Sequence, residues 1–370
     1  MPEAFLVKRC AHHRWLHRFA LLTALVTFCL IWVGGLVTSH GVGMAVPDWP
    51  TTYGYNMFFF PVSQWLGGIF YEHTHRLVAS GVGFLTIILA IWTWAQEERR
   101  WLRNLGWIAL GAVVLQGVLG GLRVTQMKDE IGIFHAALAQ LFFVLTGAIA
   151  LFTSPWWQRG SPGKMTIYAG GRFRYLFAAV TGLIFVQLVL GASMRHQHAG
   201  LAIPDFPLAY GKVWPSADEA SVERYNRDRR EVTALNPITA GQIHLQMTHR
   251  LAAVAILAAV AWAAGRTRQR LGWGSPLARL AAVWLGLIVV QGALGAFTIW
   301  TNKAADIATA HVAVGALSLM TGSLLVLMAA RLELGASECA GSATPAAAAA
   351  GELAASARVT PSGSELPAGR

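Results

Sequence analysis

Eight long apolar segments constrain the fold of this chain more than any other feature. An α-helix rises 1.5 Å per residue, so about 20 apolar residues cross the hydrocarbon core of a bilayer. The segments are continuously apolar and do not alternate with polar residues, which predicts helices instead of a membrane β-barrel. The expected fold class is an all-α integral membrane protein. Its eight transmembrane helices cover roughly residues 19–38, 76–95, 104–123, 132–153, 173–194, 247–265, 277–299 and 307–330.

The composition agrees with a membrane location. Only 13% of the 370 residues are charged, about half the share of roughly 25% found in soluble domains. The 15 tryptophans are typical of proteins that meet the membrane interface. The net charge of +11 does not indicate a nucleic-acid partner, because the basic residues cluster at the ends of the apolar segments. The lipid bilayer is the expected surrounding, and no nucleic acid is expected.

Lysine and arginine predict the side on which each connection lies. They gather before the first segment and after the second, fourth and sixth segments, at Lys8, Arg9, Arg14, Arg18, Arg99, Arg100, Arg103, Arg159, Lys164, Arg172, Arg266, Arg268 and Arg270. Cytoplasmic connections carry this excess. Both termini are therefore predicted to be cytoplasmic, in a bacterial-type cytoplasmic membrane. The long fifth connection also holds four arginines, at 224, 227, 229 and 230, but long loops cross the membrane largely regardless of charge.

An internal repeat covers most of the chain. The phrase AVPDWPTTYG at 45–54 returns as AIPDFPLAYG at 202–211, and THRL at 74–77 returns at 248–251. Matching residues are 157 positions apart at the first phrase and 174 apart at the second, so the second copy carries about 17 extra residues around 216–237. Each copy contains four helices, and an even number keeps both copies in the same orientation, unlike the inverted repeats of transporters. The sequence therefore predicts two tandem, pseudo-symmetric four-helix bundles.

These patterns divide the chain into five parts. The last part is rich in Ala, Gly, Ser and Pro and is expected to be disordered because it cannot bury a core. The parts are a cytoplasmic N-terminal segment (1–18), an N-terminal bundle (19–153), a cytoplasmic linker (154–172), a C-terminal bundle (173–330) whose long outer loop spans 195–246, and a cytoplasmic tail (331–370).

Four of the twelve histidines are duplicated by the repeat: His75 matches His249, and His135 matches His311. Each is expected to open an even-numbered helix, which places all four at one depth near the outer leaflet. Two imidazoles on facing helices are the arrangement with which a bundle holds a haem iron from both sides. A single histidine at a helix end is more often an interfacial residue that hydrogen-bonds a neighbour. The duplication and common depth favour two haem sites, since two imidazoles leave zinc or copper short of ligands.

The two copies differ at one position beside these histidines. Glu72 lies three residues before His75, whereas Gln246 lies three residues before His249. Residues three apart share a helix face, so Glu72 is expected beside any iron that His75 binds. A carboxylate that only complemented the helix dipole is expected in both copies. The asymmetry therefore indicates one site that does chemistry, where Glu72 relays protons or stabilises a developing cation, and one site that only holds a haem.

Arg76 and Arg250 directly follow the paired histidines. They are candidates for contacts to haem propionates, which suit the bidentate geometry of arginine. Snorkelling of the side chains to the membrane interface is an equal alternative. The glycines of QGVLGGLR and QGALGAF indicate close helix packing or room for a flat macrocycle.

Residues 19–330 resemble the haem A synthase family. The resemblance rests on GGLVTSHGVGMAVPDWP, the ExxHR motif at 72–76, QGVLGGLRVT with His135, and the second THR with His311. It implies that His249 and His311 ligate a haem b cofactor, that the substrate haem O binds near His75 and His135, and that Glu72 is catalytic. The reaction it implies oxidises the C8 methyl group of haem O to a formyl group by successive hydroxylations.

The same resemblance implies a haem O synthase, an unidentified electron donor and cytochrome oxidase, as product acceptor, as partners. Many members of the family carry a cysteine just before the Pro-Asp phrase, where this chain has Val46 and Ile203, so no role of such cysteines transfers. Two other functions stay open from the sequence: a di-haem b-type electron-transfer cytochrome that modifies neither haem, and a haem carrier. Whether the chain forms a homo-oligomer also stays open.

Overall fold

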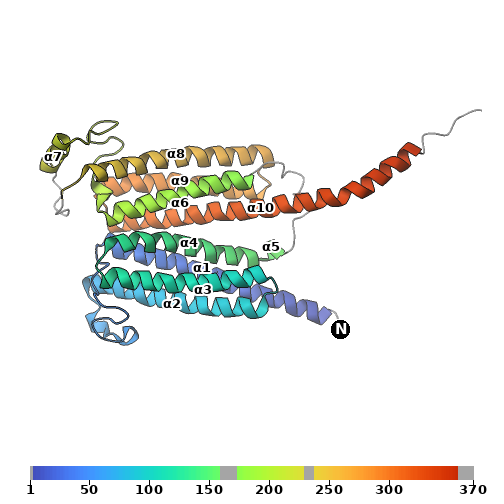
Figure 1. Cartoon of the computed structure of the whole chain (residues 1–370), viewed down its shortest axis with the longest axis horizontal. Coiled ribbons are helices and arrows are strands. Elements are labelled where there is room, and N and C mark those ends of the chain that lie inside the picture. Colours follow the sequence, from blue (N-terminus) through green and yellow to red (C-terminus); the bar gives the residue numbers. More distant parts are fainter. Residues whose placement is uncertain (1–2, 159–172, 229–236, 357–370) are drawn as a thin grey trace, which may run out of the picture.

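The computed structural model describes residues 3–158, 173–228 and 237–356, with side chains from 14 to 332 inside these ranges. The described residues form helices joined by loops, with no named strand among them (Figure 1). Eight long helices carry the architecture: α1 (Glu3–Ser39), α2 (Gly67–Gln96), α3 (Arg100–Thr125), α4 (Asp129–Thr153), α6 (Phe173–His196), α8 (Ala240–Leu271), α9 (Pro276–Trp300) and α10 (Ala305–Ser356). Short elements in the connections are η1 (Met57–Phe59), η2 (Val62–Gln64), α5 (Pro155–Gln158), η4 (Ala199–Leu201) and α7 (Glu219–Asp228).

All eight predicted transmembrane segments correspond to helices that are long and apolar enough to cross a membrane. The protein is therefore a multi-pass integral membrane protein, and the predicted fold class is confirmed in this respect. Two helices at the loop connections start earlier than predicted. α2 begins at Gly67 and α8 at Ala240, about two turns before the predicted positions. Both helices start earlier because polar residues near their starts, Glu72 and Gln246, have buried partners, as described below.

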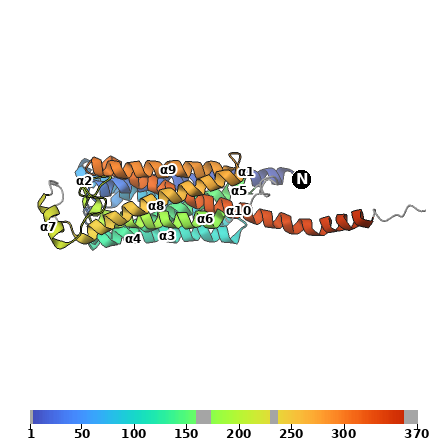
Figure 2. The same cartoon turned by 90° about the horizontal axis from the view of Figure 1, so that it is seen from above.

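The helices pack in two rings of four. α1, α2, α3 and α4 each contact the next helix in this order, and α4 closes the ring on α1. α6, α8, α9 and α10 repeat the pattern, with α10 closing on α6. The rings lie side by side with their helices roughly parallel (Figures 1 and 2). Their interface is formed by α1 and α4 against α6 and α10, where Phe143 and Met320 belong to one buried apolar cluster.

The two loops that carry the repeated Pro-Asp phrase, residues 40–66 and 197–239, lie at the same end of the molecule (Figure 1). We call this end the loop end. α1, α3, α6 and α9 finish there, and α2, α4, α8 and α10 begin there. The placement of the loop end on the outer side of the membrane stays a prediction from the distribution of Lys and Arg.

The expectations for the chain ends need two corrections. Residues 3–18 continue α1 and do not form a separate segment. The tail predicted to be disordered from residue 331 instead remains helical to Ser356, as part of α10. Its alanine run gives a physical reason, since alanine has the highest intrinsic helix propensity. Residues 357–370 and most of the predicted linker, 159–172, lie outside the described residues.

Candidate functional site

In both Pro-Asp loops the aspartate carboxylate accepts hydrogen bonds from backbone N–H groups of its own loop. Asp48 accepts hydrogen bonds from the backbone N–H groups of Tyr53 and Gly54, and Asp205 accepts them from Tyr210 and Gly211. In each loop the tyrosine and the glycine have positive φ angles, which turn their amides toward the carboxylate. Burial raises the pKa of Asp48, but the hydrogen bonds from Gly54, Thr51 and Tyr53 outweigh it and lower the pKa. The aspartates are therefore internal acceptors of the loops.

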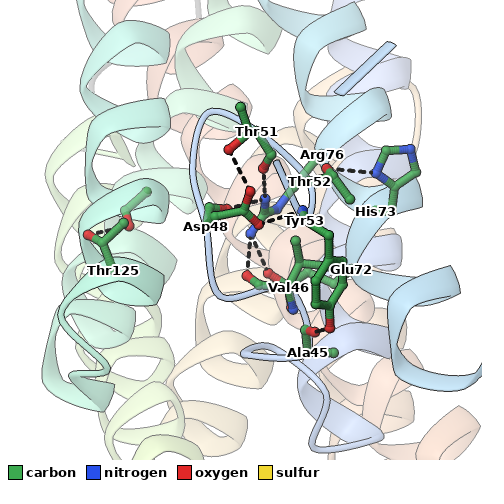
Figure 3. A network of polar contacts seen from close by, with 11 residues as sticks. Ala45, Val46, Asp48, Thr51, Thr52, Tyr53, Glu72, His73, Arg76 and Thr125 are labelled. Carbon is green, nitrogen blue, oxygen red and sulfur yellow. Dashed lines mark hydrogen bonds and ion pairs between the residues drawn. The ribbon is translucent and has the colours of Figure 1, made fainter. Parts of the chain in front are cut away.

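Arg76 and Arg250 fix these loops to the helices beneath them. The Nη1 atom of Arg76 donates to the carbonyl oxygens of Asp48 at 2.7 Å and Thr51 at 3.0 Å, and its Nη2 atom donates to that of Val46 at 2.8 Å (Figure 3). Arg250 donates in the same way to the carbonyl oxygens of Leu208 and Asp205. Both guanidinium groups thus have backbone partners, and their contact with haem propionates stays a prediction.

Glu72 and Gln246 hold the matching loop amides. The Oε2 atom of the buried Glu72 accepts from the backbone N–H of Val46 at 2.9 Å, and its Oε1 atom accepts from Arg76 at 2.8 Å. The Oε1 atom of Gln246 accepts from the N–H of Ile203 at 2.7 Å. The two side chains therefore share a structural role. They differ in charge, because Glu72 pairs with its arginine (Figure 3) whereas Gln246 is neutral.

The four duplicated histidines lie inside the bundles, which corrects the expectation that they open their helices. His75 lies about two turns into α2 and His249 about two turns into α8. His135 and His311 lie nearly two turns into α4 and α10. The side chains of His75 and His135 interact electrostatically, as do those of His249 and His311. The structure therefore brings together both predicted pairs, one in each ring.

A glycine on a neighbouring helix receives each of the four imidazole rings. A Cβ atom added at Gly34 would lie 3.0 Å from Cε1 of His75, and one added at Gly120 would lie 3.3 Å from Cε1 of His135. In the second ring, Gly191 lies against His249 at 3.3 Å and Gly295 against His311 at 3.2 Å. All four glycines lie five residues before the end of their helix at the loop end. The four rings therefore share one depth.

The ring nitrogens provide the test for a haem ligand. The Nδ1 atom of each of the four histidines is buried and has no hydrogen-bond partner of normal geometry. Buried polar atoms are normally paired, so these unpaired imidazoles fit the role of ligands to a bound group. Among the described residues no group of three or more His, Cys, Asp and Glu side chains is arranged to hold a metal ion. Two histidines per ring, in an otherwise apolar bundle, fit the axial ligation of a haem iron.

Sequence reasoning missed two groups of residues near these pairs. Gln116 donates a hydrogen bond to the backbone oxygen of His135 at 3.0 Å, and Gln187 donates to that of His249 at 2.9 Å. The repeated LQG and VQG phrases carry one signal for such a role, at Gln116 and its counterpart Gln291. The second group consists of two arginines. The first of them, Arg123, interacts electrostatically with His75 and His135.

Arg195 is the second of these arginines, and it joins the two rings of helices. Its Nη2 atom donates to the backbone oxygen of Gly35 on α1 at 2.7 Å and to the hydroxyl of Ser39. It also interacts electrostatically with His311. The repeat gives no signal for Arg195 because the matching residue of the first copy is Thr38.

Comparison with known proteins decides the family. The family model for COX15-CtaA, cytochrome oxidase assembly protein, matches residues 60–323. The chain belongs to the COX15-CtaA family. The matched residues include Glu72, all four paired histidines and both arginines of the loop contacts. The site described here is therefore part of the region that defines membership of the COX15-CtaA family.

Individual COX15-CtaA relatives match over most of the chain. The haem A synthase of Geobacillus kaustophilus is 27% identical over 358 residues, which cover 90% of this chain and 98% of that protein. The haem A synthase of Nitrosomonas eutropha is 25% identical over 88% of this chain and 96% of its own length. That of Alkalihalophilus pseudofirmus is 28% identical over 206 residues, which cover 55% of this chain and 67% of that protein.

Proposed function

We propose that this protein is a haem A synthase, an oxidoreductase that converts the C8 methyl group of haem O to a formyl group and supplies haem A for cytochrome oxidase. The observation that carries the proposal is the pair of buried histidine sites at one depth, of which only one has a carboxylate beside it. Membership of the COX15-CtaA family and the similarity to haem A synthases support it.

The two sites divide the work. His249 and His311 hold a haem b cofactor in the C-terminal ring, and His75 and His135 hold the substrate haem O in the N-terminal ring. When bound, a haem b with two imidazole ligands supplies one-electron transfer. The four glycines and the glutamine contacts to the helix backbone orient the imidazoles, and the surrounding apolar bundle keeps water away from them.

Glu72 supplies the acid–base function of the substrate site. Its carboxylate is buried and held by one backbone amide and by Arg76, so its position is fixed before substrate binds. A carboxylate in this position accepts a proton from the substrate side or stabilises positive charge that develops at the oxidised methyl carbon. Gln246, which occupies the matching position, can accept the loop amide but cannot take a proton in this way.

The partners follow from the reaction. A haem O synthase must supply the substrate, an electron donor must serve the cofactor, and cytochrome oxidase receives the product. We place the protein in a bacterial cytoplasmic membrane with both termini in the cytoplasm. Under this orientation the loop end and both haem sites face the outer leaflet, so exchange of haem O and haem A takes place on that side.

Extraction of haems tests the proposed function. The protein is expressed in membranes that make haem O but contain no synthase for haem A, together with a competent electron donor, and the extracted haems are separated by chromatography. We expect haem A to appear only when the protein is present. Two haems bound per protein without formation of haem A contradict the proposal and favour the electron-transfer cytochrome.

Gly295 provides a test of how the cofactor ligands are positioned. In Gly295→Ala the new methyl group meets Cε1 of His311 at 3.2 Å, which forces the ring to shift by a few tenths of an ångström and costs about 1 kcal/mol. We expect a changed absorption spectrum and a shifted midpoint potential of the bound haem b. Gly292→Ala, on the same helix with nothing within 4 Å, is the matched control and leaves both unchanged. Equal spectra for the two variants contradict the positioning role.

A further inference from the structure

The first Pro-Asp loop continues into a long stretch without charge. No Asp, Glu, Lys, Arg or His occurs between Asp48 and Glu72, and 15 of the 23 residues in this interval are of the types Phe, Trp, Tyr, Met, Val, Leu, Ile and Pro. The stretch contains η1 and η2 and leads into α2. Water-exposed loops are usually polar, so a stretch of this composition needs an apolar partner.

Part of the stretch is anchored to α2 through His73. The ring of Phe60, which is 4% exposed, packs against His73 at 5.0 Å, and the ring of Trp65 packs on its other side at 4.8 Å. His73 is fully buried and contacts the hydroxyl of Thr52 at 3.2 Å. His73 is therefore the buried point on which this loop rests.

The remaining apolar side chains of the stretch point outward. Phe58, Phe59, Val62 and Leu66 are 65%, 81%, 76% and 71% exposed. We call these four residues the apolar face of the first loop. They fall within nine positions of a loop that is anchored through the buried Phe60, so their exposure follows from the way in which the loop is anchored. Contiguous exposed apolar residues mark an interaction surface.

Exposed aromatic residues also lie on the helix that follows the apolar face in the chain. Phe70 and Phe84 on α2 are 46% and 64% exposed, and α2 is one of the membrane-spanning helices. The loop lies beside the end of α2, level with the helix ends, whereas α7 of the second loop extends beyond them (Figure 1). The exposed side chains are thus placed at the border between the hydrocarbon core and the headgroups.

The second loop has the opposite character. It exposes Val213 and Trp214, but charged residues flank them closely. These are Lys212 before them and Asp218, Glu219, Glu223, Arg224, Arg227 and Asp228 after them. The helix α7 packs back onto this loop through Tyr225, whose ring stacks on Tyr210 at 3.6 Å. The extra residues around 216–237 therefore cover the second loop with a charged, water-facing helix; residues 229–236 lie outside the described residues.

We propose that the apolar face of the first loop is seated in the lipid bilayer, at the acyl–headgroup boundary on the side of the loop end. Aromatic and aliphatic side chains without nearby charge bind at this depth through apolar burial. The carbonyl oxygens of Val46, Asp48 and Thr51 in the same loop accept hydrogen bonds from Arg76, so the lipid contact and the arginine hold the same loop. The proposal rests on the membrane location alone and is independent of the haem chemistry.

Site-specific fluorescence quenching tests this proposal in the full-length protein. Cys10, Cys29 and Cys339 are replaced by serine, and single cysteines are introduced as Phe59→Cys and Val62→Cys, with Glu223→Cys on the exposed face of α7 as the matched control. Each variant is labelled with an environment-sensitive fluorophore and reconstituted in phosphatidylcholine vesicles. Quenching by aqueous iodide is compared with quenching by lipids that carry a nitroxide near the headgroup end of the acyl chain. Retention of the wild-type circular dichroism spectrum and elution volume confirms that each variant is folded.

We expect labels at positions 59 and 62 to be quenched more strongly by the nitroxide lipid than by iodide, because apolar faces bury at the headgroup–acyl boundary. The label at position 223 shows the reverse pattern. Iodide quenching at position 59 equal to that at position 223 overturns the proposal, because the loop then faces water. Protection from both quenchers at positions 59 and 62 also overturns it, because protein then covers the apolar face.

Discussion

Glu72→Gln abolishes formation of haem A while haem b remains bound. The structure gives this variant its value, because Gln246 shows that an amide at this position accepts the loop N–H at 2.7 Å. The substituted side chain therefore keeps the hydrogen bond to Val46, and the loop keeps its shape. What is lost is the negative charge and the ability to take a proton. General acid–base groups contribute about 10²- to 10⁴-fold to rates, so we expect haem A to fall by at least about 100-fold.

The measurement is the ratio of haem A to haem O extracted from membranes, with haem b per protein determined from the absorption spectrum. Gln246→Glu is the matched control, since it makes the reverse exchange, of an amide for a carboxyl group, in the other ring of helices. It is expected to leave haem A formation in place. Glu72→Ala removes the loop contact as well and separates the two roles. Wild-type levels of haem A in Glu72→Gln show that Glu72 serves only the loop, and loss of haem b in this variant refutes our assignment of the sites.

His249→Ala loses the haem b spectrum. His249 would be one of two histidine ligands in the proposed C-terminal site, and its removal would leave only His311 to hold the haem. We expect little or no haem b in the purified variant and, as a consequence, no formation of haem A. Added imidazole, which fits the space left beside Gly191, restores part of the spectrum if the bundle is otherwise intact.

His75→Ala is the matched control, because His75 is packed against Gly34 as His249 is packed against Gly191. It removes the same atoms from the other ring and is expected to retain haem b while losing haem A. The comparison between the two variants therefore separates a ligand of the cofactor from a ligand of the substrate. Retention of haem b in His249→Ala together with its loss in His75→Ala shows that the two rings have the opposite roles.

Much of the site could be predicted from residues alone. The apolar segments predict the eight helices because crossing a bilayer requires a fixed length of apolar chain, and every segment is confirmed. The duplication identified His75, His135, His249 and His311 as two pairs, since only these four histidines recur at matching positions. It also singled out Glu72 by its mismatch with Gln246.

Other features could not be predicted because they depend on contacts between distant residues. The starts of α2 and α8 were placed too late, since a polar turn looks like loop until its partners, such as the Val46 amide for Glu72, are known. Arg76 and Arg250 were predicted to contact haem propionates or to snorkel to the membrane interface, yet their N–H groups donate to loop carbonyl oxygens. Phe58 and Phe59 are exposed whereas Phe60 is buried, and three identical consecutive residues do not indicate which of them is buried.

The sequence by itself determined the membrane class, the number of spans, the repeat and the identity of the paired histidines. These follow from length, polarity and recurrence, which are properties of residue order. Only the tertiary structure decided which glycine receives each imidazole, how the carboxylate of Glu72 is bonded, and that Arg195 of one ring binds α1 of the other. Such contacts join residues up to 160 positions apart, and they form only where helix packing brings the side chains within hydrogen-bonding or van der Waals distance.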